Sequence, residues 1–261
     1  MNMDITIGIL TWNSKDLLKG CLDSIYNNPI SAVFEVIVID NCSEDDSKAM
    51  VKRDYPQARL IENSRNLGVA PGRNQIIGAS RGRYIMFLDV DTLVLPGAVD
   101  TFVACMGKDP SVAIGGPRLV YEDGSLQLSC RPFPKISNIV MEGTSLRGYF
   151  SNSRFVKDYT MEDWDHKDAR DVDWLYGACL VIRKDRIEEI GVFDERFFYL
   201  YEDIDICWRA KKLGMRVRYF PEATIVHFLR RERKKFFHPK IRSHIKSIGL
   251  YLLKDYYGLI R

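Results

Sequence analysis

The sequence predicts an α/β protein built on a mostly parallel sheet with helices on both faces. Short apolar runs alternate with amphipathic stretches through the first half of the chain, which is the rhythm of successive βαβ units. These runs are nearly continuously apolar, as is typical of strands buried on both faces. With 261 residues and 46% hydrophobic content, the chain can bury one substantial core.

The first half contains the clearest elements. We expect strands at residues 5–10, 34–39, 59–61 and 84–88, and helices at residues 15–26, 44–53 and 72–79. In the first helix, the apolar residues fall at helical spacing on one face. Ligands of such sheets bind at the carboxyl ends of the strands, so the polar residues found there are the candidates for function.

The second half is less regular. A turn containing Asp123-Gly124 predicts a hairpin between residues 112–121 and 126–130. Order returns at residues 172–183, followed by helices at 185–190 and 203–213 and a strand at 216–220. Residues 133–170 show no clear periodicity, and we interpret them as a variable loop region that carries specificity.

Composition excludes several classes of protein. The net charge of +3 arises from 38 basic and 35 acidic residues and gives no overall indication of a nucleic-acid or membrane partner. The six cysteines include no Cys-x-x-Cys pair, which favours free thiols in a reducing compartment. There is neither a secretory signal nor an apolar run long enough to span a bilayer. We therefore expect a cytoplasmic protein, soluble or peripheral on the inner face of the membrane.

Asp89 and Asp91 are the most informative residues, because they follow the buried strand 84–88. Side chains alternate along a strand, so both carboxylates project to one side, where they repel each other unless a cation joins them. Mg²⁺ or Mn²⁺, shared with the phosphates of a nucleotide, is the natural partner. Taken alone, an Asp-x-Asp pattern also fits two solvated acids in a loop.

Asp40 ends another strand, where α/β sheets place a residue that contacts a nucleotide base or ribose. Capping of the following helix explains Asp40 equally well. The first strand leads into Thr11-Trp12-Asn13, which lacks the glycine fingerprint of dinucleotide-binding folds. That absence disfavours a dehydrogenase.

A glycine-bearing loop enters the helix at residues 72–79. It contains Asn66, Gly68, Arg73 and Asn74, and its arginine has the reach and charge to contact phosphates. By itself the loop is a weak indication of function.

Glu202 and Asp203 form a third acidic cluster at a helix start, after the aromatic run 197–199. An apolar environment of this kind can hold a carboxylate as a poised base. Asp205 and Arg209 have the spacing of an i,i+4 surface ion pair. His227 stands at the end of a strand expected at residues 223–227, where a lone histidine is more often a core residue than a ligand.

Taken in order, these motifs resemble the family 2 inverting glycosyltransferases with a GT-A fold, particularly their bacterial rhamnosyltransferase-like branch. The resemblance covers residues 4–228. The matching stretches are residues 9–13, 38–45, 66–74, 87–92, 177–183, 191–198 and 202–209 through to His227.

The resemblance implies specific roles. It implies Mg²⁺ or Mn²⁺ bound by Asp89, Asp91 and His227, a catalytic base at Asp203 beside Glu202, and an acceptor site near Trp174, Gly177 and Ala178. The residues implied to contact the nucleotide-sugar donor are Thr11, Trp12, Asn13, Asp40, Asn66, Gly68, Arg73, Asn74 and Asp89. Many members of the branch carry Asn-Pro-Asp where this chain has Asp89-Val90-Asp91. The second acid suggests a firmer requirement for metal.

The implied reaction is a single displacement that inverts the anomeric carbon. A sugar, with rhamnose from dTDP-rhamnose as one option, would move from a nucleotide donor to a hydroxyl of a glycan or lipid-linked acceptor in cell-surface polysaccharide synthesis. A sugar-phosphate nucleotidyltransferase is the alternative enzyme, disfavoured because no glycine- and basic-rich loop follows the first strand. A non-catalytic nucleotide- or glycan-binding subunit is the alternative outside enzymes.

The C-terminal residues 229–261 differ in character from the catalytic domain expected at residues 1–228. Between Arg230 and Lys246 stand eight basic residues against the single acid Glu232. From Pro239, apolar residues recur at helical spacing, which predicts a basic amphipathic helix. Packing on the catalytic domain and contact with an anionic membrane explain it equally well. Nucleic acid is disfavoured because no recognised binding module accompanies the patch.

Overall fold

The computed structural model describes residues 3–143, 149–150, 152–228 and 239–256. Its main sheet has the order β3-β2-β1-β4-β11-β6-β12-β5, with β7 on β6 and β9 on β12, while β8 and β10 form a separate pair. The strands are β1 (Ile5–Thr11), β2 (Phe34–Asp40), β3 (Arg59–Glu62), β4 (Tyr84–Asp89), β5 (Thr92–Val94), β6 (Val112–Val120), β7 (Leu126–Gln127), β8 (Cys130–Arg131), β9 (Arg170–Asp171), β10 (Trp174–Leu175), β11 (Cys179–Arg183) and β12 (Arg216–His227).

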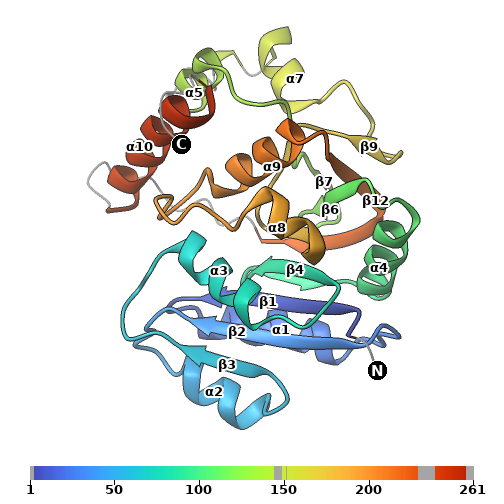
Figure 1. Cartoon of the computed structure of the whole chain (residues 1–261), viewed down its shortest axis with the longest axis vertical. Coiled ribbons are helices and arrows are strands. Elements are labelled where there is room, and N and C mark those ends of the chain that lie inside the picture. The colour runs from blue at the N-terminus through green and yellow to red at the C-terminus, as the bar shows by residue number, and fades with distance from the viewer. Residues whose placement is uncertain (1–2, 144–148, 151, 229–238, 257–261) are drawn as a thin grey trace.

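Helices cover both faces of this sheet (Figure 1). They are α1 (Lys15–Tyr26), α2 (Ser47–Asp54), α3 (Val69–Ala79), α4 (Ala98–Lys108), α5 (Ile136–Gly143), α7 (Arg154–Thr160), α8 (Ile187–Ile190), α9 (Glu202–Lys212) and α10 (Pro239–Tyr251). A 3₁₀ turn, Lys184–Arg186, precedes α8, and a π-helical turn, Leu252–Tyr256, follows α10.

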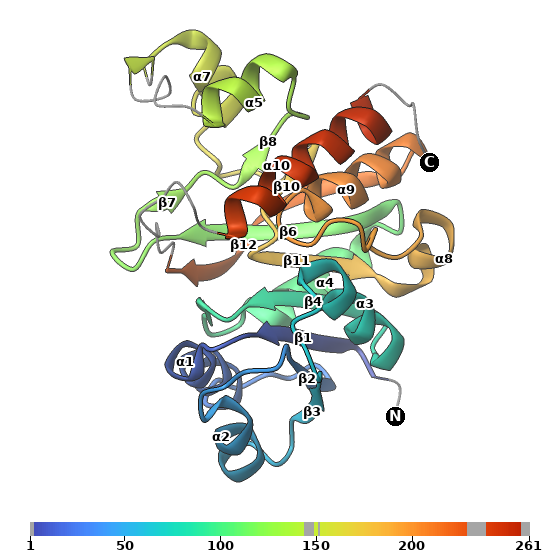
Figure 2. The same cartoon turned by 90° about the vertical axis from the view of Figure 1, so that its left-hand side faces the viewer.

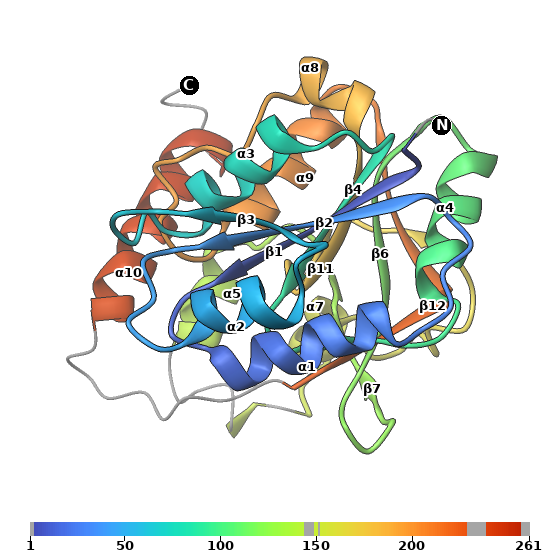
Figure 3. The ribbon, with the colours of Figure 1, turned by 90° about the horizontal axis from the view of Figure 1, so that it is seen from below.

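The four N-terminal strands run parallel, as predicted, while β11 is antiparallel to both β4 and β6. Successive residues of β2 enter opposite layers of the core. Val36 and Val38 join the layer beneath α1 and α2, whereas Ile37 and Ile39 join the layer beneath α3 and α9. Figure 3 shows α1 and α2 on one side of β1–β3 and α3 on the other. A two-sided core explains why these strands are continuously apolar in sequence.

Residues 133–170 depart from the prediction of a loop, because they contain α5 and α7. These helices have 8 and 7 residues, too short to establish a 3.6-residue period in the sequence. The predicted hairpin is present between β6 and β7, but its second strand ends at Gln127. Cys130–Arg131 pairs instead with β10.

The last strand joins two segments that the sequence predicted as separate strands. The apolar runs 216–220 and 223–227 belong to one strand, β12, which pairs with β6 along both runs across a register shift between Phe220 and Thr224. A bulge of this kind lets a strand continue after an interruption of its pattern. It carries His227 to the far end of the sheet.

The C-terminal helix α10 packs on the rest of the protein (Figure 2). Tyr251 is buried, and its hydroxyl donates a hydrogen bond to the Pro134 carbonyl at 3.2 Å. Packing, one of the two roles open from sequence, is thus observed. Among the described helices, none combines the length and apolar content needed to span a bilayer. All six cysteines are free thiols, as expected.

Candidate active site

Strand pairing brings Asp91 and His227 together from distant parts of the sequence. β5 runs antiparallel to the end of β12, with Thr92 opposite His227. The backbone N–H of Phe228 also donates to the Asp91 carbonyl at 2.8 Å. Asp89 ends β4, where its backbone N–H donates to the Ala178 carbonyl at 3.0 Å. The pairing of β5 with β12, and the bond from the end of β4 to Ala178, therefore fix the backbone of all three candidate metal ligands.

The side chains of Asp89, Asp91 and His227 offer one ligand atom each, and these atoms lie within 4.8 Å of one another. His227 Nε2 is 3.5 Å from Asp91 Oδ1. Two carboxylates and one imidazole suit Mn²⁺, and the carboxylates alone suit Mg²⁺ when water and phosphate complete the shell. The residues present therefore fit the divalent ion that the sequence implied.

Gln127 orients the histidine and was not identified from the sequence. Its Oε1 lies 2.7 Å from His227 Nδ1, and a carboxamide oxygen can only accept, so Nδ1–H is the donor. Nε2 then faces Asp91, and in the neutral imidazole it is the nitrogen that carries the lone pair. A buried partner on the second ring nitrogen is a usual feature of metal-binding histidines.

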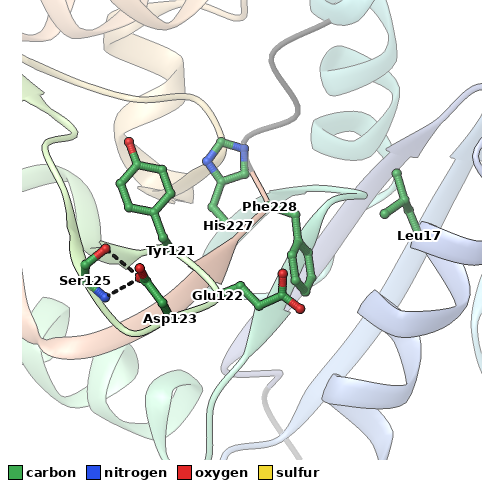
Figure 4. A pocket seen from close by; sticks show the side chains of 7 residues that line it. All are labelled: Leu17, Tyr121, Glu122, Asp123, Ser125, His227 and Phe228. Carbon is green, nitrogen blue, oxygen red and sulfur yellow. Dashed lines mark hydrogen bonds between the residues drawn. The ribbon is translucent and has the colours of Figure 1, made fainter.

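A hollow of about 670 Å³ borders this cluster on the His227 side. Figure 4 shows its lining: Leu17 from α1, four residues of the turn after β6, and two at or just after the end of β12, namely Tyr121, Glu122, Asp123, Ser125, His227 and Phe228. Neither Asp89 nor Asp203 lines it. The hollow therefore meets the candidate metal site at His227 and does not contain the candidate base.

Asp203 lies in the first turn of α9 with both carboxylate oxygens occupied. Oδ2 accepts from the Gly177 N–H at 2.9 Å, and Oδ1 accepts from the Ile204 N–H at 2.9 Å. Burial raises the pKa of Asp203, while the charge of Arg73 opposes that rise. Burial likewise raises the pKa of its neighbour Glu202 to about 7. These carboxyl groups are held more basic than ordinary acids, which suits proton acceptance.

The sequence suggested that Arg73 reaches a phosphate. In the structure Arg73 is only 4% exposed and lies among the carboxylates. Its guanidinium donates to the Gly177 carbonyl at 2.8 Å and to Glu202 Oε1 at 3.2 Å, and lies 3.5 Å from Asp89 Oδ1. Glu202, predicted to be catalytic, is thus the buried partner of an arginine. Arg73 thus joins Asp89, a candidate metal ligand, to Glu202, the neighbour of the candidate base.

Gly177 allows this approach because it has no side chain. A Cβ atom there would lie 3.0 Å from the Arg73 guanidinium and 3.1 Å from Asp203 Oδ2. The other two predicted acceptor residues are buried. The Trp174 indole donates to the Pro132 carbonyl at 2.9 Å and stacks on Tyr176, and Ala178 lies in the core.

Thr11 and Asp40 stand side by side at the ends of β1 and β2. Asp40 Oδ1 accepts from the Ser43 N–H at 2.8 Å, so Asp40 closes a local turn; helix α2 begins only at Ser47. Asp40 Oδ2 and Thr11 Oγ1 are buried and have no hydrogen-bond partner among the described residues. Buried polar atoms are rarely left unpaired, so these two atoms retain hydrogen-bonding capacity at the ends of β1 and β2.

The remaining predicted donor residues have varied surroundings. Trp12 is 48% exposed beside Thr11, whereas Asn13 accepts from the Glu44 N–H at 2.7 Å. Asn66 accepts from the Gly68 N–H at 2.9 Å, within the loop before α3. Asn74 is turned toward residues 193–195, where it bonds both the N–H and the carbonyl of Phe193. Asn13, Asn66 and Asn74 therefore brace loops around the site.

The family of the chain follows from comparison with known proteins. The model of the Glycosyl transferase family 2 matches residues 6–164, more than half of the chain. The chain belongs to this family. It is a glycosyltransferase, and the matched region contains Thr11, Asp40, Arg73, Asp89 and Asp91.

Two bacterial rhamnosyltransferases are among the relatives of this family 2 chain. It is 26% identical over 234 residues to the N-acetylglucosaminyl-diphospho-decaprenol L-rhamnosyltransferase of Mycobacterium tuberculosis, covering 85% of this chain and 76% of that protein. It is 24% identical over 259 residues to the rhamnosyltransferase WbbL of Escherichia coli K12, covering 96% and 93% respectively.

Solved structures share the fold. GalNAc-T7 with UDP, GalNAc and Mn²⁺ aligns with a TM-score of 0.68 at 14% identity; the alignment covers 97% of this chain but 49% of the other, so this chain spans about half of its length. The mannosyltransferase PcManGT from Pyrobaculum calidifontis, with GDP-Man and Mn²⁺, aligns with a TM-score of 0.60 at 19% identity, covering 98% and 71%. The family 2 fold of the GT-A type expected from the sequence is confirmed.

Proposed function

We propose that this family 2 enzyme is an inverting, metal-dependent glycosyltransferase acting in cell-surface polysaccharide synthesis. Its proposed donor is a nucleotide-diphosphate sugar, with dTDP-rhamnose as the leading candidate, and its acceptor is a hydroxyl of a glycan or lipid-linked saccharide. The supporting observation is the arrangement of two acidic centres, Asp89/Asp91/His227 and Asp203, on either side of the Arg73 guanidinium. The names of two relatives support the sugar.

The chain's own residues support a single-displacement mechanism. Asp203 accepts the proton of the acceptor hydroxyl as the oxygen attacks the anomeric carbon. The Gly177 N–H holds the carboxylate in place through its bond to Oδ2. Asp89, Asp91 and His227 would hold Mg²⁺ or Mn²⁺, which when bound offsets the negative charge of the leaving nucleoside diphosphate. Thr11 and Asp40 would pair with the nucleoside.

Calorimetric titration of dTDP, UDP and GDP, each with Mn²⁺ and again with EDTA, tests the donor site. We expect one nucleotide to bind at least about tenfold more tightly with Mn²⁺, because ligation through phosphate adds to the nucleoside contacts. Asp91→Asn should remove that gain and leave the EDTA affinity unchanged. Equal affinities with and without Mn²⁺ would contradict the metal-dependent site, and binding only of a nucleotide other than dTDP would exclude dTDP-rhamnose.

We also propose that the C-terminal helix contacts an anionic membrane on its cytoplasmic face. The basic run Arg230–Lys235 lies outside the described residues. On α10, however, Arg242 and Lys246 are exposed beside Ile245, which is 63% exposed, and Leu253 is exposed one turn beyond the helix. Basic residues alternating with apolar ones are typical of helices that lie on anionic lipid surfaces.

Charge reversal tests this contact. Arg242→Glu with Lys246→Glu should weaken co-sedimentation with phosphatidylglycerol vesicles by roughly tenfold or more, since each basic residue near such a surface contributes about 1 kcal/mol. Lys52→Glu with Lys108→Glu, both exposed at other helices, is the matched control. Vesicle binding that is equal in the two double variants would show that α10 is not the contact.

A further inference from the structure

The turn that leads into the catalytic helix has an unfavourable backbone. Leu200 and Tyr201, which immediately precede Glu202 and Asp203, have φ values of 63° and 75°. Residues other than glycine seldom adopt this left-handed region, and they keep it only when their surroundings hold them there. Something must therefore hold the start of α9.

The C-terminal segment supplies that support. The Tyr201 ring packs against His244 and Tyr251, with ring centroids 5.8 and 5.4 Å apart. The Ser247 hydroxyl donates to the Tyr199 carbonyl at 2.9 Å. Figure 1 shows α10 beside the segment that runs into α9. Contacts from α10 thus surround the strained turn.

Lys254, one turn further on, ties the same segment to α9 itself. Its ammonium lies 2.6 Å from Asp205 Oδ1 and 2.9 Å from Asp194 Oδ2. The lysine side chain is 11% exposed, and that of Asp205 is completely buried. Arg209 occupies the other oxygen of Asp205 at 2.8 Å. Asp205 and Arg209 were expected from the sequence to pair at the surface. They instead form a buried network with Lys254 and Asp194.

Asp194 extends this network to the loop after α8. Burial alone would raise the pKa of Asp194, but hydrogen bonds from Arg196 and Lys254 lower it well below its usual range. Both carboxylates around Lys254 are therefore matched by cations. A buried charge pair of this kind favours one arrangement of its elements, because displacing the lysine leaves Asp205 underneutralised.

We infer that Lys254 is a positioning residue for the transfer reaction. It fixes the first turn of α9 from behind and so sets the direction in which Asp203 presents its carboxylate. The C-terminal segment is then a part of the catalytic site, although it contributes no group that touches the substrates. This inference rests on the proposed role of Asp203 as the base.

The kinetic test compares Lys254→Met, which keeps the aliphatic stem, with Lys254→Arg and with Lys52→Met, which removes an exposed lysine from an ion pair with Glu62. We expect Lys254→Met to lower kcat by roughly 10- to 100-fold, the cost of a small misplacement of a catalytic group, with the donor KM within about twofold of wild type. Lys254→Arg should recover most of kcat. The inference would be overturned if Lys254→Met left kcat unchanged, or if it raised the donor KM by the same factor by which it lowered kcat.

Hydrogen exchange provides a readout that does not depend on turnover. Lys254→Met should speed amide exchange in the peptide covering residues 199–207, while the peptide covering β2 stays protected as in wild type. Ser247→Ala, which removes one bond without leaving a buried charge, serves if Lys254→Met does not fold, and should change the same peptide. Unchanged exchange there overturns the inference. If Lys254→Met exchanges faster in this peptide but the wild-type protein transfers no sugar, the result contradicts the proposed function and not the contact between the C-terminal segment and α9.

Discussion

Asp203→Asn should abolish sugar transfer while leaving nucleotide binding intact. An amide cannot accept the acceptor's proton, and general base catalysis is worth about 10²- to 10⁴-fold in rate. Its single carbonyl oxygen can still accept the Gly177 N–H bond, while the bond from the Ile204 N–H is lost, so the Gly177 contact that holds the side chain should persist. The measurement is kcat for transfer from the nucleotide sugar that binds, with calorimetric affinity for its nucleotide alongside.

Asp165→Asn, at an exposed acid away from the cluster, is the matched control. The rate in the wild type should also fall as the pH is lowered, because the protonated carboxyl cannot accept a proton and burial raises its pKa above 3.8. In the Asn variant the residual rate should lose this acid limb. Transfer at the wild-type rate in Asp203→Asn would move the base elsewhere, with Glu202 the nearest candidate.

Arg73→Met should be the most destabilising single change in the site. Removing the guanidinium leaves Glu202 buried without its cation and takes the counter-charge from Asp89 and Asp203. Breaking a buried ion pair by deleting one partner costs about 3–5 kcal/mol. We expect a loss of this size in the free energy of unfolding measured by urea denaturation.

Arg65→Met, at an exposed arginine in the preceding loop, should change stability by less than about 0.5 kcal/mol. Adding Glu202→Gln to Arg73→Met should recover part of the loss, because the neutral amide no longer needs a cation. If the midpoint of urea unfolding is the same in Arg73→Met as in wild type, Arg73 is not the counter-ion that the geometry indicates.

The parts of the site that follow from local sequence were predicted best. Asp40 and Asp89 end strands whose apolar runs are unmistakable, and the family resemblance joined them to Asp203 and His227. The contacts of Arg73 and Gln127 could not be foreseen, because their partners are distant in sequence. Arg73 bonds residues 104 and 129 positions away, and Gln127 bonds a histidine 100 positions away. No local periodicity encodes such contacts.

The same limit explains the errors in the fold. Strand β12 was predicted as two separate strands because its bulge interrupts the alternation that identifies a strand. Asp205 and Arg209 have the spacing of a surface pair, and only the packing of the C-terminal segment buries them. Sequence spacing predicts which residues can meet along one element, whereas tertiary packing decides what surrounds them.

The shared position of Arg73 gives the two ends of the reaction a thermodynamic linkage. Burial raises the pKa of both Asp89 and Asp203, and the charge of the single guanidinium between them opposes that rise at both carboxyls. A divalent cation held at Asp89 would add positive potential at Asp203 and would favour its ionised form. Reciprocity requires that ionised Asp203 strengthen the binding of that cation by the same factor. If Asp203 is the base, as proposed, binding of a donor with its cation would thus favour the ionised form of the base before the acceptor's proton must leave.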